Sequence, residues 1–117
     1  MNALVLLSVL LAEPSGLEQV RESKTLRWGA DAQGGAPYVF ADPHDPSKVK
    51  GFEVDIAAEL GKELGIEVRF EQRQWSSLFQ DVGRGDVDLA MNGLEVTEER
   101  RKEARFSRPY YLFSEQL

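Results

Sequence analysis

The sequence predicts an α/β fold with a mostly parallel sheet and helices on both faces, and three observations support this. Short apolar runs typical of strands recur at 25–30, 66–70 and 87–91. Stretches with helical periodicity lie between these runs, and glycines close them. Strands that alternate with helices form βαβ units, and right-handed crossovers then place helices on both faces of the sheet.

The first elements in the chain are a strand and a hairpin. Residues 25–30 (TLRWGA) alternate in polarity and predict the strand, and the glycines and proline of 33–37 predict a turn after it. The paired Asp-Pro units of 42–47 break both helix and sheet, so they predict a surface loop. The flanking segments 38–40 and 49–53 are then expected to pair as the two strands of a hairpin.

A helix is expected to follow, beginning near Phe52 and stopping at Gly65. Glu53 and Asp55 lie in its first turn, where carboxylates meet the positive end of the helix dipole. They are offset by two residues, so they do not face each other and form a poor catalytic pair. The predicted apolar stripe has a spacing of four and consists of Phe52, Ile56, Leu60 and Leu64.

The second half of the chain continues the alternation of strands and helices. A helix is predicted at 75–82, and the glycines of 83–85 close it. Thr97 is expected to cap a short charged helix, with Arg100 at its third position. The other predicted elements are strands at 66–70 and 87–91 and an extended stretch at 106–111.

The first segment differs from the rest of the chain. Residues 3–12 are a run of apolar or small residues that is too short to span a bilayer as a helix. This run predicts a secretory signal peptide cleaved after Ala12. A short buried helix is the alternative, because no Lys or Arg precedes the run and Leu10 is large for its position before the cleavage site. The predicted divisions are a signal-peptide core (1–12), a linker (13–24) and one globular domain (25–117).

The composition excludes several classes of function. A net charge of −6 argues against nucleic acid and anionic lipid as partners, because both attract basic surfaces. The absence of cysteine excludes disulfides, iron–sulfur clusters and cysteine-based zinc sites. The sequence contains no phosphate-binding glycine loop, no G-x-S-x-G motif and no H-E-x-x-H motif. We therefore expect no metal, no cofactor and no catalytic activity.

Polar residues follow three predicted strands, in the segments 31–35, 72–76 and 92–97. Ligands of open α/β sheets bind beyond the carboxyl ends of the strands, so these segments predict a binding rim. Arg100 is the strongest candidate, since a guanidinium pairs with a carboxylate through two parallel hydrogen bonds. Its alternative is a solvated arginine in a charged run. The candidate rim residues are Asp31, Trp75, Asn92, Gly93, Glu95 and Arg100.

Two of these residues also have plain structural interpretations. Trp75 is either an aromatic wall for the apolar part of a solute or a residue of the core. Asp31 either contacts a solute or caps the turn that follows the first strand.

Six motifs occur in order from about residue 25 to the end of the chain: LRWGAD (26–31), GFEVDIA (51–57), WSSL (75–78), GDVDLA (85–90), TEER (97–100) and FSRPYY (106–111). With this ordered set the chain resembles family 3 of the bacterial solute-binding proteins, the polar amino-acid binders of ABC importers. The resemblance implies the first lobe of a periplasmic-binding-protein type II fold. It also implies a periplasmic or other extracytoplasmic location, an amino-acid-like solute and an ABC permease as partner.

The resemblance implies a role for each rim residue. The arginine matching Arg100 clamps the α-carboxylate of the ligand, the aromatic matching Trp75 packs on the ligand, and the aspartate matching Asp31 lies near its side chain. The residues that match the pocket lining are Asn92, Gly93 and Glu95. The chain departs from the family in two places: Glu95 stands where the family has Ser or Thr, and no aromatic residue precedes Pro37.

Members of the family have two lobes, and this chain corresponds to the first. We expect a second lobe or a partner chain to complete the pocket, and a lone lobe to bind solute weakly because an open half-site desolvates its ligand poorly. Two alternatives to solute capture remain open. One is a dehydratase-like enzyme on the same fold with Glu95 as general acid or base, and the other is a ligand-sensing input lobe of a larger protein.

Overall fold

A computed structural model of the protein describes residues 16–33 and 35–112. The predicted signal-peptide core, residues 1–12, lies outside the described residues. Within the predicted linker the chain forms helix α1 (Gly16–Ser23), and Val20 of this helix is buried. None of the helices in the described part is long and apolar enough to cross a membrane.

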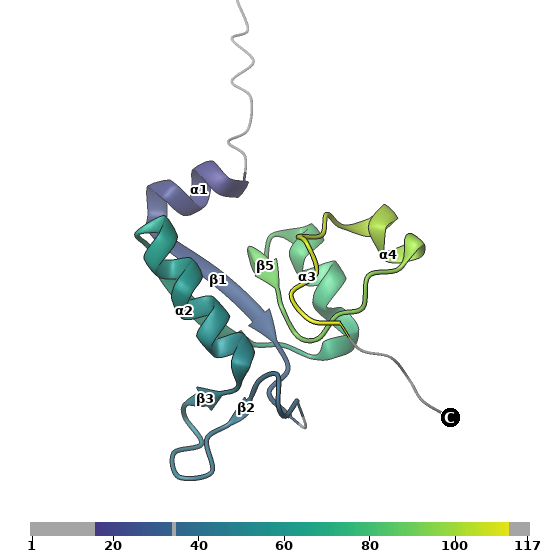
Figure 1. The fold of residues 1–117 in the computed structure, drawn as a ribbon. Coiled ribbons are helices and arrows are strands. Elements are labelled where there is room, and N and C mark those ends of the chain that lie inside the picture. Colours follow the sequence, from purple (N-terminus) through teal and green to yellow (C-terminus); the bar gives the residue numbers. More distant parts are fainter. Residues whose placement is uncertain (1–15, 34, 113–117) are drawn as a thin grey trace, which may run out of the picture.

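A three-stranded parallel sheet forms the centre of the fold (Figure 1). Strand β1 (Thr25–Ala30) lies between β4 (Glu67–Gln72) and β5 (Leu89–Ala90). In the register of the sheet, Trp28 of β1 is opposite Phe70 of β4. The predicted parallel sheet is confirmed, although β5 is shorter than the expected strand at 87–91.

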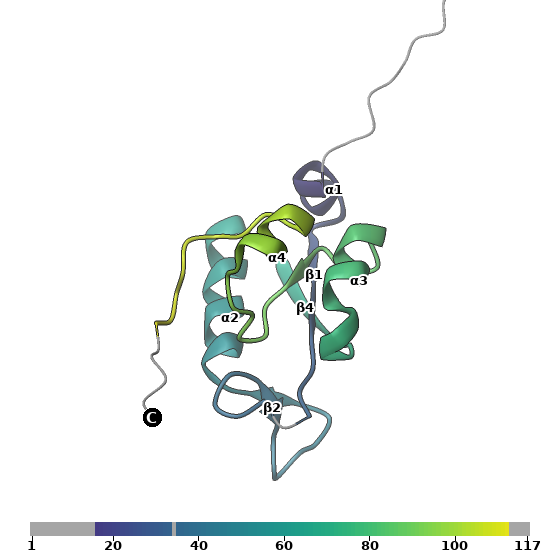
Figure 2. The same cartoon turned by 90° about the vertical axis from the view of Figure 1, so that its right-hand side faces the viewer.

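Helices cover both faces of this sheet, as the sequence predicts. Helix α2 (Phe52–Leu64) lies on one face and α3 (Leu78–Arg84) on the other (Figure 2). The predicted helix at 75–82 begins as a 3-10 turn, η1 (Trp75–Ser77), before it continues as α3. Helix α4 (Glu98–Glu103) follows the sheet and is capped by the hydroxyl of Thr97, which accepts a hydrogen bond from the backbone N–H of Arg100.

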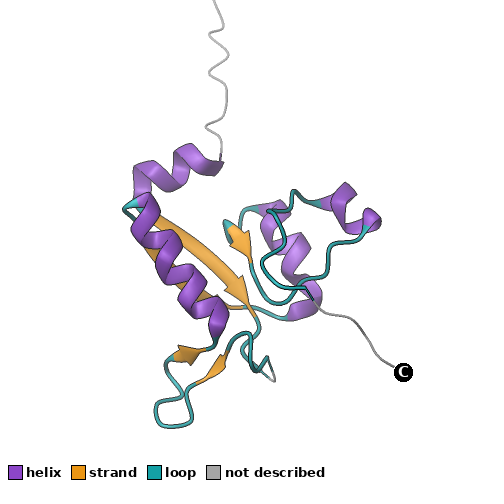
Figure 3. Cartoon of the chain, in the orientation of Figure 1, coloured by secondary structure: helices purple, strands orange, loops and turns teal. Residues whose placement is uncertain are grey.

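The predicted hairpin is present but short. Strands β2 (Phe40–Ala41) and β3 (Val49–Lys50) pair in antiparallel orientation beyond the carboxyl end of β1 (Figure 3). The sequence predicts Tyr38 in the first strand of this hairpin, but the residue lies in a turn. Its backbone N–H donates to the carbonyl oxygen of Gly35 at 2.7 Å. The extended stretch expected at 106–111 forms no strand.

The buried face of α2 differs from the predicted apolar stripe. Its buried residues are Glu53 and Ala57, whereas Leu64 at the end of the stripe is 41% exposed. A Cβ on Gly61 would lie 3.0 Å from the carbonyl oxygen of Ile66. Small residues therefore let this helix approach the sheet closely, and the larger side chains of the stripe lie beside the contact. The main cluster of buried core residues consists of Trp28, Ala30, Val39, Ala57 and Met91.

An ion pair joins two of the sequence motifs across the sheet. The guanidinium of Arg27 in β1 contacts both carboxylate oxygens of Asp88, with Nη2 at 2.9 Å and Nε at 3.1 Å. The same guanidinium donates to the backbone carbonyl oxygens of Gly85 and Asp86. This bidentate pair fixes the start of β5 next to β1 and so sets where the loop after β5 emerges.

Candidate functional site

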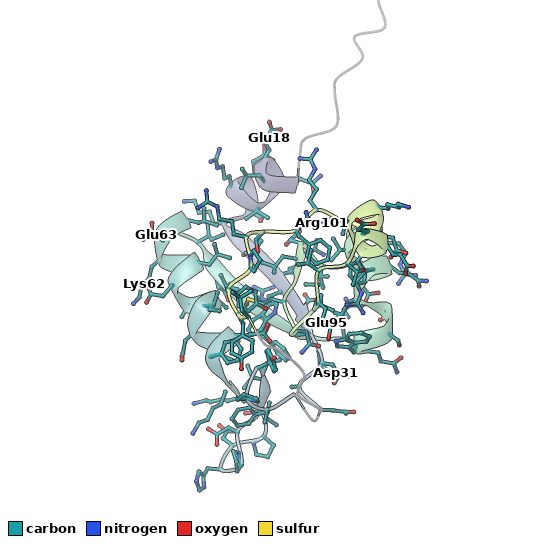
Figure 4. All side chains as sticks on the ribbon, turned by 45° about the vertical axis from the view of Figure 1, so that its right-hand side comes forward. Glu18, Asp31, Lys62, Glu63, Glu95 and Arg101 are labelled. Carbon is teal, nitrogen blue, oxygen red and sulfur yellow. The ribbon has the colours of Figure 1, made fainter. Side chains whose placement is uncertain are left out.

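The carboxyl ends of the three strands meet in a network centred on Asp31. The backbone N–H of Asp31 donates to Oδ1 of Asn92 at 2.9 Å, and Nδ2 of Asn92 donates back to the carbonyl oxygen of Asp31 at 3.3 Å. From β4, Nε2 of Gln72 donates to Oδ1 of Asp31 at 2.9 Å. Figure 4 shows the labelled Asp31 and Glu95 on the side of the domain away from Glu18 of α1.

The carboxylate of Asp31 also caps the turn after β1. Its Oδ1 accepts from the backbone N–H of Gln33 at 2.9 Å, and its Oδ2 accepts from that of Trp75 at 3.4 Å. The hydrogen bond from Gln33 is the main cause that lowers the pKa of Asp31, with Gln72 and Trp75 contributing. Asp31 is therefore a turn cap in this structure, and it remains ionised at neutral pH.

The side chain of Arg100 lies against aromatic rings. Its guanidinium carbon is 5.2 Å from the centre of the Trp75 ring and 5.7 Å from that of Phe79. Its Nη1 donates to the carbonyl oxygen of Glu95 at 3.0 Å. A cation over an aromatic face is held electrostatically, so the orientation of Arg100 is fixed by the rim and differs from that of a solvated arginine.

Trp75 and Glu95 are accessible to a solute from outside. The indole of Trp75 is 45% exposed, so it does not belong to the core. Glu95 is also exposed, and its backbone carbonyl holds Arg100. The structure thus brings three candidate residues, Arg100, Trp75 and Glu95, to one open surface with a cation, a carboxylate and an aromatic face.

The other two candidates, Asn92 and Gly93, direct their polar groups inward. Asn92 is only 8% exposed, and its side chain bonds to the backbone of Asp31. Gly93 has a φ of 61°, and its N–H donates to Oε2 of Glu53 at 3.0 Å. The N–H of Gly93, a residue that the family resemblance assigns to the pocket lining, therefore has a protein partner here.

Glu53 is the residue that the sequence analysis missed. It is fully buried, and its Oε2 accepts hydrogen bonds from the N–H of Gly93 and from the hydroxyl of Tyr110. Desolvation raises its pKa, against the effect of these two bonds. The available signal is the spacing of four residues from Glu53 to Ala57 and again from Ala57 to Gly61, the small residues on the face of α2 that packs on the sheet.

Tyr38 supplies an aromatic wall close to the rim. Its ring lies 4.9 Å from that of Phe52, and a Cβ on Gly93 would lie 3.0 Å from it. The first loop lacks an aromatic residue before Pro37, but Tyr38 directly after this proline packs against the loop that follows β5. A small cavity of about 100 Å³ lies between that loop and the segment 106–111.

A larger apolar groove runs beside β5. Its volume is about 440 Å³, and α2, α3, β5 and the segment 104–107 contribute to its walls. Ile56 and Leu60 of the predicted stripe line it, and Ile56 also packs against the buried core. Strand β5 has only β1 as a partner among the described strands, so its second edge faces this groove.

Sequence comparisons relate the chain to known proteins. A family model described as bacterial extracellular solute-binding proteins, family 3, matches residues 26–117. The chain is 31% identical over 99 residues to the L-cystine-binding protein TcyJ of Escherichia coli (strain K12), which covers 85% of the chain and 36% of the relative. It is 32% identical over 108 residues to the cyclohexadienyl dehydratase of Pseudomonas aeruginosa, which covers 92% of the chain and 39% of the relative. The chain thus spans less than half the length of these relatives, of which one is a binding protein and one an enzyme.

Solved structures give the same picture of the fold. An ancestral cationic amino acid solute-binding protein superposes with a TM-score of 0.77 at 36% identity, covering 83% of this chain and 41% of that chain. A mutant of domain 1 of TmArgBP in its arginine-bound form superposes with a TM-score of 0.75 at 29% identity, covering 81% of this chain and 71% of that chain. The match to an isolated domain shows that the described fold is that of a single lobe.

Proposed function

Because this chain belongs to family 3 of the bacterial extracellular solute-binding proteins, we propose that it binds an amino acid or a related small carboxylate outside the cytoplasm for an ABC importer. The single observation that carries this proposal is the guanidinium of Arg100, held 5.2 Å above the exposed indole of Trp75 at the strand-end rim. A permease is the partner that takes up the solute.

The anchor for the solute carboxylate is Arg100. One of its nitrogens, Nη1, donates to the carbonyl oxygen of Glu95, and a guanidinium carries further N–H groups for a carboxylate. The aromatic rings beneath it hold the planar group in one orientation before the solute arrives. A preoriented fork loses less entropy on binding than a free side chain does, so the carboxylate pair is stronger here than on an open surface.

The carboxylates at the rim favour a cationic amino acid. Asp31 carries a negative charge at neutral pH, and Glu95 provides a second exposed carboxylate next to the anchor. These groups attract an α-amino group or a basic side chain and repel an acidic one. Relatives support the same class, since one matched structure is a cationic amino acid binder and another is an arginine-bound domain.

A second lobe or a partner chain completes the site in this proposal. The chain spans 36% of the length of TcyJ, and the rim described here provides one wall of a pocket. The apolar groove beside the unpaired edge of β5 also needs a cover, because an exposed apolar groove at a free strand edge promotes association. The lone lobe is expected to keep weak binding.

A titration with amino acids tests the proposal. The chain is titrated with arginine, lysine, histidine, glutamine and cystine while its amide resonances are followed by two-dimensional NMR, which detects millimolar affinity. Arginine and lysine are expected to bind most tightly, and the largest shifts are expected in the loop after β5. Arg101→Ala is the control for Arg100→Ala, because Arg101 is the exposed next residue of the same helix. A folded chain that responds to no amino acid, or an Arg100→Ala variant that binds like the unchanged chain, would refute the proposal.

A second candidate function is an enzyme, favoured by the position of Glu95 and by the likeness to a dehydratase. In its protonated form the exposed carboxyl group of Glu95 can act as a general acid: the hydroxyl group leaves as water, and the ring carboxylate leaves as CO2 to complete the aromatic ring. Incubation with a cyclohexadienyl carboxylic acid and detection of the aromatic product test this function. Turnover that disappears in Glu95→Gln supports the enzyme, and turnover that persists in Glu95→Gln argues against this role of Glu95.

A further inference from the structure

The carboxyl group of Glu53 joins three segments that are distant in the sequence. The residue lies in the first turn of α2, and its backbone N–H donates to the carbonyl oxygen of Tyr38 at 3.1 Å. Its Oε2 accepts from Gly93 in the loop after β5 and from the hydroxyl of Tyr110 in the segment that leaves the domain. One oxygen atom thus connects the helix, the rim loop and the exit segment.

This oxygen is one of several contacts that hold the rim loop, residues 91–95. Nε1 of Trp28 donates to the carbonyl oxygen of Met91 at 2.8 Å, Asn92 bonds to the backbone of Asp31, and Arg100 holds the carbonyl of Glu95. The contact from Gly93 to Glu53 is the one in this set whose protein partner is a carboxyl group. The hold on the middle of the loop therefore depends on the protonation state of one buried side chain.

Glu53 cannot contact a solute directly, because none of its surface is exposed. Its second oxygen, Oε1, is buried and has no hydrogen-bond partner among the described residues. An orphaned buried carboxylate oxygen is costly, so the two hydrogen bonds that Oε2 accepts must offset this cost. The two hydrogen bonds that Oε2 accepts come from Gly93 in the rim loop and from Tyr110 in the segment that leaves the domain.

Within the described part of the chain, no cationic side chain pairs with Glu53. The phenol of Tyr110 donates a hydrogen bond to the carboxyl group of Glu53. The phenol of Tyr38 lies near enough to Tyr110 to raise its pKa electrostatically. Burial is the main cause that raises the pKa of Tyr110, and the hydrogen bond to Glu53 adds to it, so this phenol stays protonated as a donor. The ring of Tyr110 is 6.4 Å from that of Phe52, which packs the exit segment onto the start of α2.

We infer that Glu53 is a positioning residue for solute binding. Its carboxylate fixes Gly93 and Tyr110 to the same point, so the loop that carries Glu95 keeps its place relative to the exit segment. This inference rests on the proposed function, because it assigns to Glu53 the placement of the rim that binds the solute. Loss of the carboxylate loosens the loop and weakens binding without removing any group that touches the solute.

Two variants and two readouts test this role in the chain. Glu53→Gln removes the charge, and Tyr110→Phe removes one donor and keeps the ring. In both variants the Gly93 amide is expected to exchange its hydrogen faster, and the affinity for arginine is expected to fall about fivefold, the equivalent of one hydrogen bond. The double variant is expected to lose no more than Glu53→Gln alone, because both changes act on one cluster.

The pH dependence of arginine affinity is the readout that a merely structural residue would not move. Charge-assisted bonds are stronger than neutral ones, so the affinity of the unchanged chain is expected to fall as pH is lowered through the pKa of Glu53. Glu53→Gln should lack this component of the profile. Asp55→Asn is the matched control, because Asp55 lies on the exposed side of the same helical turn. Tyr111→Phe controls for Tyr110→Phe, since its ring stacks on Phe52 at 5.6 Å.

Each outcome separates this inference from the proposed function. Faster exchange at Gly93 with unchanged arginine affinity and pH profile overturns the inference and leaves the function standing. Equal exchange in Glu53→Gln and the unchanged chain overturns it as well. A folded chain that binds no amino acid overturns the proposed function and the inference with it. If Glu53→Gln fails to fold, Tyr110→Phe carries the test alone, because Tyr110 is 45% exposed and its ring is retained.

Discussion

Asp31 and Glu53 are two carboxyl groups in one small domain, and their environments act on them in opposite directions. Asp31 lies at the open rim and accepts hydrogen bonds from Gln33, Gln72 and Trp75, which lower its pKa. Glu53 lies inside, where desolvation outweighs the two bonds it accepts and raises its pKa. The number of hydrogen-bond donors alone does not decide whether the pKa of a carboxyl group is raised or lowered. Burial also matters, because the hydrogen bonds must offset the desolvation of the charged form.

The difference separates two tasks within the lobe. The rim carries the charged side chains of Asp31, Glu95 and Arg100 near the surface. Hydrogen bonds and a cation–π contact hold Asp31 and Arg100 in place. The interior around Glu53 presents nothing to a solute and connects the rim loop to the exit segment. This division predicts that substitutions at the rim change binding most, and that substitutions in the interior change stability and its pH dependence.

The largest effect is expected at the rim, from Arg100→Ala. Removal of a charged hydrogen-bonding partner of a carboxylate costs about 2–3 kcal/mol, so the affinity for arginine should fall roughly 100-fold. Arg100→Lys should recover only part of this loss, because an ammonium cannot form the parallel pair. Titration by NMR measures both variants. Equal affinity in all three proteins would break the assignment of binding to the rim.

The next effect is expected where the two regions meet, from Gly93→Ala. An alanine at a φ of 61° costs about 1–2 kcal/mol, and its Cβ would also press on the ring of Tyr38 at 3.0 Å. The free energy of unfolding, measured in urea, should fall by at least this amount. Gly83→Ala in α3 is the control, since a Cβ there meets nothing within 4 Å and alanine favours the helix. A Gly93→Ala chain as stable as the Gly83→Ala chain would contradict the described loop conformation.

A smaller effect is expected in the pH dependence of stability through Glu53. Its pKa is raised in the folded state, so the folded chain binds more protons than the unfolded chain between the two pKa values. The free energy of unfolding should therefore fall as pH rises through this window, and Glu53→Gln should remove that slope. Urea unfolding from pH 4 upward measures it. A slope of the same size in Glu53→Gln would place its origin elsewhere.

The smallest effect is expected from Asp31, with the opposite sign. Its folded-state pKa is lowered, so its contribution to stability is present above the unfolded pKa and is lost as pH falls through the folded one. Asp31→Asn should flatten the acid side of the stability profile and leave the slope assigned to Glu53 in place. The same unfolding series tests this prediction. If Asp31→Asn instead changed the slope of the free energy of unfolding that is assigned to Glu53, the two carboxyl groups would not act independently.

Much of the fold follows from the sequence because local signals and long-range pairing agree. The strand at 25–30, the stop at Gly65 and the cap at Thr97 all lie where the sequence predicts them. The stripe on α2 was misassigned because periodicity identifies a helix but does not tell which of two adjacent faces meets the sheet. Ala57 and Gly61 decide this, since their small side chains permit the closer approach.

The candidate site was predictable in part for a similar reason. Topology places Asp31, Trp75 and Arg100 at one rim, and the structure brings them there. The inward direction of Asn92 and Gly93 depends on tertiary hydrogen bonds that no local pattern encodes. Glu53 was missed because a glutamate at a helix start is usually exposed, and only the packed structure reveals its burial.

The two tryptophans give this lobe a natural pair of optical reporters. Trp28 is 2% exposed with its indole N–H bonded to Met91, whereas Trp75 is open to solvent beneath the guanidinium of Arg100. The intrinsic fluorescence of the chain therefore has a component from the core and a component from the rim. Solute arrival should alter the emission of Trp75, and unfolding should shift that of Trp28 to longer wavelengths. Occupancy and integrity can thus be followed in one unlabelled sample.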